Sequence, residues 1–235
     1  MPALQRERTG DGVEIVRLDR PDVRNALDTA TIAELLATLA ELAADPALRV
    51  LVLSTTSTRA FCAGADVGEE LDREGGVARM EAFAALYAAL DAFPAPVVCV
   101  CVGNCVGAGA ELVAGSDLRV GGDNLKLAWA GSRLGVPVGP ARLAPLIGVA
   151  RAKDLVFTGR VVGMEEALAP GRLAPPPPPP PPAGPAGGAA GAYPPEGLRR
   201  LKAMFRDLDA TPARVAHENE LLVAFQREGA GLPQG

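Results

Sequence analysis

The hydrophobic residues of the chain recur with two periods, which predict strands that alternate with helices. Residues 13–18 alternate between apolar and polar side chains, whereas 50–54 and 96–102 are continuous apolar runs typical of buried strands. In 28–44 the apolar residues return every three or four positions, which predicts an amphipathic helix with Asp28 or Thr29 at its N-cap. The same criteria predict a strand at 117–120 and helices at about 76–92, near Gly109, near 141–157 and at 212–227. This alternation favours a layered α/β fold.

One segment, residues 170–195, departs from this pattern because it consists mostly of proline, glycine and alanine, with eight consecutive prolines at 175–182. It divides the chain into a core at 1–169, the proline-rich segment, and a C-terminal region at 196–235 in which we expect helices. A polyproline II spacer is the simplest interpretation, and a ligand for an SH3-like groove is the functional alternative. A third hypothesis is that 174–192 departs from the native sequence, through a reading-frame error or placeholder residues.

Composition and charge narrow the class of protein. With 49% hydrophobic and 22% charged residues, the 235-residue chain can bury a sizeable core, which excludes disorder throughout. The net charge of −5, without a long block of like charge, argues against a nucleic-acid binder. The sequence has neither an apolar run of membrane-spanning length nor an apolar signal peptide at its polar start, so we expect a cytoplasmic protein with no membrane partner.

The counts of cysteine and histidine exclude several kinds of chemistry. Three of the four cysteines lie in Cys-x-Cys-x3-Cys at 99–105, a spacing that structural zinc sites do not use, and we interpret all four as buried, reduced thiols. We therefore expect no metal. The only histidine, His217, lies in a polar helical stretch, and no Gly-x-Ser-x-Gly elbow accompanies it. Phosphate-loop and dinucleotide fingerprints are also lacking from the sequence, so no nucleotide cofactor is expected.

Two glycine-containing loops, each following a predicted buried strand, are the candidate site. They run over 61–66 (FCAGAD) and 103–112 (GNCVGAGAEL). Glycine lets backbone amides approach a ligand, and a helix beginning near Gly109 directs its free N–H groups toward the same place. Two amides from separate loops can stabilise a developing oxyanion. Glu111, on the first helical turn, is then either an acid–base group or a carboxylate that complements the helix N-terminus.

Three stretches, in this order and at these separations, resemble the crotonase superfamily, the enoyl-CoA hydratase/isomerase family. They are RPDVRNAL at 20–27, AFCAGAD at 60–66 and VGAGAELVAGSDLRV at 106–120. The resemblance covers about 12–168, and PPEGLRRLKAMF at 194–205 is similar to the family's C-terminal helices. It implies a spiral of ββα units with a C-terminal helical region, assembled as a trimer or a dimer of trimers. It also implies binding of acyl-CoA and a role in fatty acid metabolism, with no cofactor beyond the coenzyme A of the substrate.

The resemblance also implies roles for individual residues. The amides of Ala65 and Ala108 match the family's oxyanion hole, and Glu111 matches one of the two glutamates of the hydratases. Loss of one oxyanion donor typically raises a barrier by about 3 kcal/mol. The positions that match substrate-binding stretches are Arg24, Asn25, Ala26, Leu27, Ala63, Gly64, Asp66, Gly107, Gly131 and Arg133.

A departure from the family pattern occurs about twenty residues after Glu111. Hydratases usually carry their second glutamate there, whereas this chain has Gly131 at the corresponding position. Ser132 cannot supply a comparable proton, and Arg133 would act as a charge stabiliser if it reached the pocket. Trp129 is interpreted as a core or pocket-wall aromatic residue, with substrate stacking as the alternative.

The leading hypothesis from the sequence is an enzyme of the enoyl-CoA hydratase/isomerase family that adds water to a 2-enoyl-CoA. Isomerisation, or another reaction that needs one glutamate such as carbon–carbon bond formation or decarboxylation, is the first alternative. A non-catalytic binding protein with the same fold is the second, because the second glutamate is missing.

Overall fold

The structure is a computed structural model that describes residues 2–168, 199 and 211–228. The proline-rich segment 170–195 and all of the expected helix at 196–207 except residue 199 lie outside the described residues. The predicted divisions of the chain at residues 169 and 195 therefore remain predictions.

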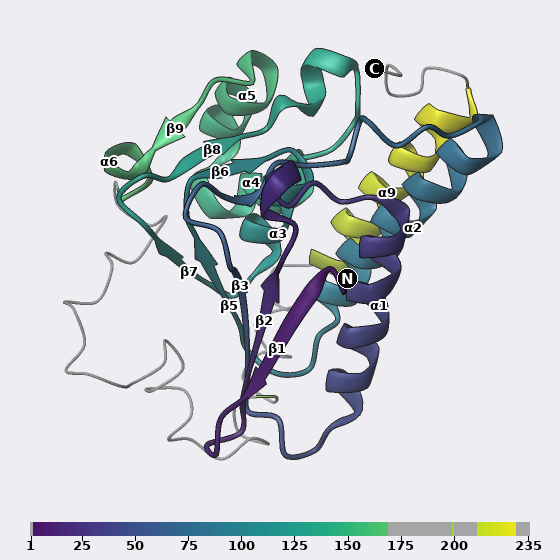
Figure 1. Cartoon of the computed structure of the whole chain (residues 1–235). Helices are drawn as coiled ribbons and strands as arrows, with labels where there is room; N and C mark the ends of the chain where they lie inside the picture. The colour runs from purple at the N-terminus through teal and green to yellow at the C-terminus, as the bar shows by residue number, and fades with distance from the viewer. Residues whose placement is uncertain (1, 169–198, 200–210, 229–235) are drawn as a thin grey trace.

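Strands β3 to β8 contribute alternately to two sheets, with β1 and β2 in the first sheet and β9 in the second (Figure 1). The first sheet has the order β1-β2-β3-β5-β7 and the second the order β4-β6-β8-β9. Their bounds are β1 Leu4–Arg8, β2 Val13–Leu18, β3 Val50–Thr55, β4 Ala60–Cys62, β5 Val97–Cys101, β6 Asn104–Val106, β7 Leu118–Gly121, β8 Lys126–Ala128 and β9 Val162–Gly163. From β3 onward one strand enters each sheet before a helix crosses back. This repetition confirms the ββα spiral that the resemblance implied.

The helices cover the sheets, and two of them begin at an aspartate cap, of which the sequence predicted the one at Asp28. Asp28 accepts a hydrogen bond from the Thr31 amide at 2.8 Å, and Asp72 accepts one from the Gly75 amide at 2.7 Å. The helices that these residues cap are α1 (Thr29–Ala44) and α2 (Arg73–Asp91). The remaining helices are α3 Ala108–Gly115, α4 Pro140–Ile147, α5 Val149–Thr158, α6 Met164–Ala167 and α9 Thr211–Arg227, with 3₁₀ turns η1 at Pro21–Val23 and η2 at Ala130–Leu134.

The C-terminal helix α9 lies along α2 (Figure 1). The Asn219 side-chain amide donates to the carbonyl of Ala84 at 2.9 Å, and Arg227 forms an ion pair with Glu81. These contacts confirm a helical region after the core and bring residues from the C-terminus against the middle of the chain.

The central strands separate two apolar clusters. Cys99 and Cys101 belong to the main core, whereas Val98 packs with Val13, Val50 and Val52 on the opposite face of the first sheet. This placement confirms that Cys99 and Cys101 share one strand face. All four cysteines are unpaired and buried, as the sequence indicated.

Candidate active site

The two glycine-containing loops meet at one edge of the second sheet. Strands β4 and β6 pair in parallel, so their C-terminal ends lie side by side. A β-carbon built on Gly64 would lie 3.8 Å from the Ala108 nitrogen, and one built on Gly107 would lie 4.0 Å from the Gly64 α-carbon. Gly64 has a φ of +106°, a conformation that other residues rarely adopt. The predicted juxtaposition of the loops is therefore present in the structure.

The amides of Ala65 and Ala108 are both free to bind a ligand. Leu27 donates to the Gly64 carbonyl and accepts from the Asp66 amide, which directs the Ala65 N–H away from this bridge. Ala108 is the first residue of α3, where an amide has no partner within the helix. Neither amide has a hydrogen-bond partner among the described residues.

A cavity of about 150 Å³ lies beside these two amides. Gly64, Ala65, Gly107 and Ala108 line one part of it, and Gly131 lines another. The other walls come from α2, from the segment after β8 and from α9. They consist of apolar side chains together with the phenol of Tyr87, and they include Met80, Phe83, Leu134, Val136, Val138 and Leu222. The cavity therefore combines two backbone donors with an apolar compartment.

Glu111 lies behind the cavity wall rather than on it. Its side chain is fully buried, and its Oε2 accepts a hydrogen bond from Arg142 Nη1 at 2.9 Å. Its other oxygen, Oε1, is buried without a hydrogen-bond partner among the described residues. Burial raises the pKa of Glu111 to about 7, against the opposing effect of the Arg142 charge. A carboxyl group with this pKa can both accept and donate a proton near neutral pH.

The indole of Trp129 lies next to Glu111. It lowers the pKa of Glu111, although its N–H makes no hydrogen bond of ordinary geometry with any described residue. The ring is buried in the main core and does not line the cavity. This placement agrees with the interpretation of Trp129 as a core aromatic residue.

At the position of the missing second glutamate, Gly131 lines the cavity, but there is little room for a side chain. A β-carbon on Gly131 would lie 3.3 Å from Val138 Cγ1 and 3.4 Å from Val136 Cβ. Two valines therefore occupy the space next to the position of the second acid. The side chains of Ser132 and Arg133 lie outside the described part of the chain.

The predicted coenzyme-binding stretch at 24–27 is a tight turn that supports the Ala65 loop. Asn25 is buried, accepts from the Arg20 amide at 2.7 Å, and donates to Thr55 and to the carbonyls of Ala60 and Phe61. Ala26 and Leu27 are also buried, so only Arg24 of this stretch exposes its side chain.

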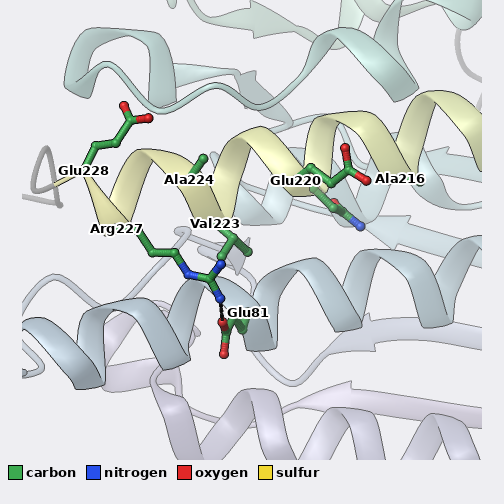
Figure 2. Close-up of a pocket in the computed structure, with 8 residues that line it drawn as sticks. Glu81, Ala216, Glu220, Val223, Ala224, Arg227 and Glu228 are labelled. Carbon is green, nitrogen blue, oxygen red and sulfur yellow. Dashed lines mark hydrogen bonds and ion pairs between the residues drawn. The ribbon is translucent and has the colours of Figure 1, made fainter.

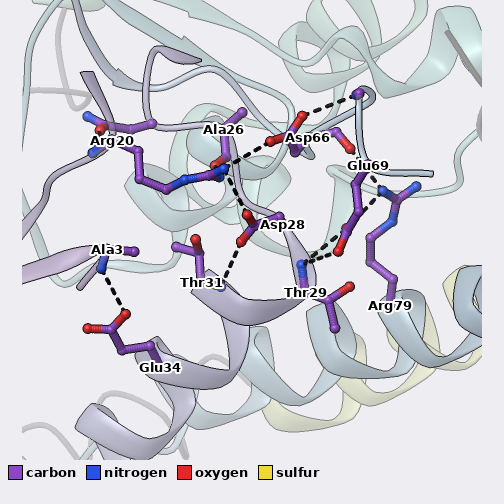
Figure 3. Close-up of polar contacts among 12 residues, drawn as sticks. Ala3, Arg20, Ala26, Asp28, Thr29, Thr31, Glu34, Asp66, Glu69 and Arg79 are labelled. Atoms are coloured by element: carbon purple, nitrogen blue, oxygen red, sulfur yellow. Dashed lines mark hydrogen bonds and ion pairs between the residues drawn. The ribbon is translucent and has the colours of Figure 1, made fainter. Parts of the chain in front are cut away.

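A polar network ties the Ala65 loop to two helices (Figure 3). Arg20 forms ion pairs with Asp28 at 2.8 Å and with Asp66 at 3.3 Å. Glu69 accepts from the Thr29 amide at 3.1 Å, and Arg79 donates to the Asp66 carbonyl at 2.9 Å. These contacts fix the loop that presents the Ala65 amide.

Three residues around Glu111 were missed by the sequence analysis: Tyr87, Arg142 and Glu218. Arg142 and Glu218 are 5% and 6% exposed, which is unusual for charged residues. The only sequence signal is a polar residue at an inward-facing helical position, which has no meaning until the partner helices are known.

Other features of the described structure are weaker candidates for a functional site. A hollow of about 620 Å³ lies between α2 and α9, and Figure 2 shows that Glu81, Glu220, Arg227 and Glu228 surround it. These side chains are exposed, and the described residues that line the hollow belong to α2 and α9 or directly follow α9. Burial raises the pKa of Cys62 to about 12, so this thiol beside Gly64 stays neutral.

Within the described ranges, no three metal-binding side chains cluster, and none of the helices combines the length and the apolar character that a membrane span requires.

Comparison with known proteins identifies relatives by sequence. The profile of a family described as enoyl-CoA hydratase/isomerase matches residues 8–173. A human protein named enoyl-CoA hydratase domain-containing protein 2, mitochondrial, is 36% identical over 162 residues, which are 66% of this chain and 55% of that protein. An enoyl-CoA isomerase/hydratase of Zymoseptoria tritici is 34% identical over 167 residues, which are 68% of this chain and 54% of that protein. The chain thus matches about half the length of these curated relatives.

Solved structures share the fold over nearly the whole chain. An enoyl-CoA hydratase from Bacillus anthracis superposes with a TM-score of 0.79 at 23% identity and covers 99% of both chains. One from Mycobacterium smegmatis superposes with a TM-score of 0.81 at 24% identity and covers 100% of this chain and 87% of its own. At this identity the likeness establishes the fold.

Proposed function

Because the chain belongs to the enoyl-CoA hydratase/isomerase family, we propose that it acts on an acyl-CoA thioester by stabilising an enolate. The observation that carries this proposal is the pair of free amides, Ala65 and Ala108, beside an apolar cavity. The thioester oxygen accepts a hydrogen bond from each amide. These bonds strengthen as negative charge develops on that oxygen in the transition state, which is where binding accelerates a reaction.

Two further features of the chain support this assignment. The N-terminus of α3 adds its dipole to the Ala108 amide. The apolar walls suit the hydrocarbon part of an acyl group and exclude water from around the amides. The chemistry needs no group beyond the thioester itself, so the coenzyme A of the substrate is the only one we propose.

Glu111 is the acid–base group of the proposed reaction. Arg142 holds Oε2, so Oε1 is the oxygen that remains for proton transfer. In the hydration of a 2-enoyl-CoA, Oε1 accepts a proton from water while the hydroxyl adds to C3. The same oxygen then returns the proton to C2.

Isomerisation is the second candidate reaction, and the surroundings of Gly131 favour it. Because Gly131 carries no side chain where a second acid would lie, Glu111 is the one carboxyl group that we propose for proton transfer. One carboxyl group suffices to take a proton from C2 of a 3-enoyl-CoA and return it to C4.

The test is turnover of matched 2-enoyl-CoA and 3-enoyl-CoA thioesters, with products identified by NMR in heavy water. We expect a 3-hydroxyacyl product from the 2-enoyl substrate, or a 2-enoyl product from the 3-enoyl substrate. The rate should not change when a chelator is added. Binding without turnover across the panel would favour the non-catalytic alternative, and absence of binding would refute the proposal.

A further inference from the structure

A single guanidinium group connects Glu111 to the C-terminal helix. Arg142 Nη1 donates to Glu111 Oε2 at 2.9 Å and to Glu218 Oε1 at 2.6 Å. Glu111 belongs to α3, Arg142 to α4 and Glu218 to α9, so three helices meet at this nitrogen. All three side chains are almost fully buried.

Glu218 and Arg142 are each fixed by a further contact. The second oxygen of Glu218, Oε2, accepts a hydrogen bond from the Ala141 amide at 2.7 Å, which anchors α9 to the first turn of α4. The guanidinium carbon of Arg142 lies 4.5 Å from the centre of the Tyr87 ring, a cation–π contact. Arg142 therefore has little freedom to turn away from Glu111.

We propose that Arg142 and Glu218 are positioning residues, through which α9 holds Glu111 Oε2 in place and leaves Oε1 for proton transfer. This inference rests on the proposed function, because it assigns how the acid–base group of that reaction is held. It gives the C-terminal helix a role in the site through a residue that does not line the cavity.

Arg142 and Glu218 also set the proton affinity of Glu111. Two carboxylates and one guanidinium leave a net negative charge in a buried cluster, which favours one retained proton. Arg142 lowers the pKa of Glu111, and Glu218 raises it by a smaller amount. The phenol of Tyr87 on α2 also faces Glu111 and Arg142, and the thiol of Cys62 on β4 lies near that phenol. Burial raises the pKa of both groups, so they stay neutral.

The chain provides its own probe of this ionisation. Trp129 is the only tryptophan, and its indole adjoins Glu111. The fluorescence of Trp129 in the unliganded protein should therefore report whether Glu111 is protonated, without any substrate.

The experiment is a pH titration of Trp129 fluorescence in the wild type and in variants. We expect a transition with a midpoint near the Glu111 pKa of about 7 that is absent in Glu111→Gln. Glu218→Gln should lower the midpoint by about one pH unit, a tenfold change in proton affinity, because it removes a like charge. Arg142→Met should raise it.

Glu220→Gln is the matched control, because Glu220 lies on the same helix but is 80% exposed. It should leave the midpoint unchanged. Where a thioester is turned over, the lower limb of the pH profile of kcat/KM should move with the midpoint in Glu218→Gln, with KM unchanged. A purely structural role would lower thermal stability without moving either profile.

The proposal would be overturned if the fluorescence transition of Glu218→Gln had the same pH midpoint as that of the wild type. If that variant does not fold, the charge-balanced double variant Arg142→Met/Glu218→Gln replaces it. Its midpoint should lie above that of the wild type, because the larger of the two opposing effects has been removed, and an unchanged midpoint would again overturn the proposal. Failure of the proposed function, by contrast, would appear as absent turnover with the fluorescence shifts intact.

Discussion

The two oxygens of Glu111 have different surroundings, and this difference separates its structural role from its chemical role. Oε2 is held by Arg142, while Oε1 is buried without a hydrogen-bond partner among the described residues. A carboxylate that only complemented a helix N-terminus would usually be exposed and bonded to backbone amides. Leaving a buried acceptor unsatisfied typically costs about 1–3 kcal/mol, a cost that function can explain.

Glu111→Gln tests this role directly. Glutamine keeps an oxygen for Arg142 and the shape of the side chain, but it cannot accept the proton. We expect turnover to fall by a factor on the order of 10² or more, with substrate affinity nearly unchanged. Steady-state kinetics with the best thioester would measure both, and equal turnover would mean that Glu111 is a structural carboxylate.

Ala108→Pro removes one oxyanion donor while preserving the fold. Ala108 is the first residue of α3, the helical position where proline is tolerated because its missing N–H has no helical partner. We expect kcat to fall by about 10²–10³-fold, the usual effect of losing one such donor. Thermal unfolding should show a stability close to that of the wild type. A variant with full activity would exclude the Ala108 amide from the reaction.

At the scale of elements, the segment 130–139 closes the cavity where a second acid would lie. Val136 and Val138 approach the position that a Gly131 side chain would take. Gly131→Glu alone should therefore increase hydration of a 2-enoyl-CoA little, because its β-carbon would lie only 3.3 Å from Val138 Cγ1, a tight contact that restrains the new side chain. Adding Val138→Ala removes the Cγ1 atom that lies 3.3 Å from this position, and a rise in hydration only in the double variant is the expected result. An equal rise in hydration with Gly131→Glu alone would show that the segment adjusts to the new side chain without a second substitution.

The secondary-structure elements also show which parts of the fold can be predicted from the sequence. Long strands such as β2 and β3 and helices such as α1 have hydrophobic periods of their own, and they were predicted nearly to the residue. Strand β1 was missed because four of its five residues are exposed, and β4, β6 and β8 because three residues are too few to establish a period.

The residues of the candidate site likewise include some that the sequence could predict and some that it could not. Ala65, Ala108 and Glu111 lie in contiguous motifs, so the sequence was enough to select them. Arg142 and Glu218 are separated from Glu111 by 31 and by more than 100 positions, and only the packing of α4 and α9 brings them together. Proximity that depends on three helices cannot be predicted from spacing along one chain.

At the scale of the whole molecule, large apolar side chains remain exposed around α5. Phe157 is 75% exposed, and Val149 and Val161 are 61% and 56% exposed. Large exposed apolar residues are typical of interfaces, and the resemblance to the family implies a trimer or a dimer of trimers, so we propose self-association in which these residues take part. Light scattering should give the mass of such an assembly, and Phe157→Glu should reduce it. A strictly monomeric mass at micromolar concentration would contradict this expectation.

The central claim is that Ala65 and Ala108 polarise a thioester carbonyl, and vibrational spectroscopy of a bound saturated acyl-CoA tests it most directly. Such a thioester has no double bond to hydrate or to move, so its carbonyl, labelled with carbon-13, can be observed in the complex. Two hydrogen bonds should shift the carbonyl stretch to a lower frequency than in water, and Ala108→Pro should reverse part of this shift. A bound carbonyl with the frequency of the free thioester, unchanged in the variant, would contradict the account.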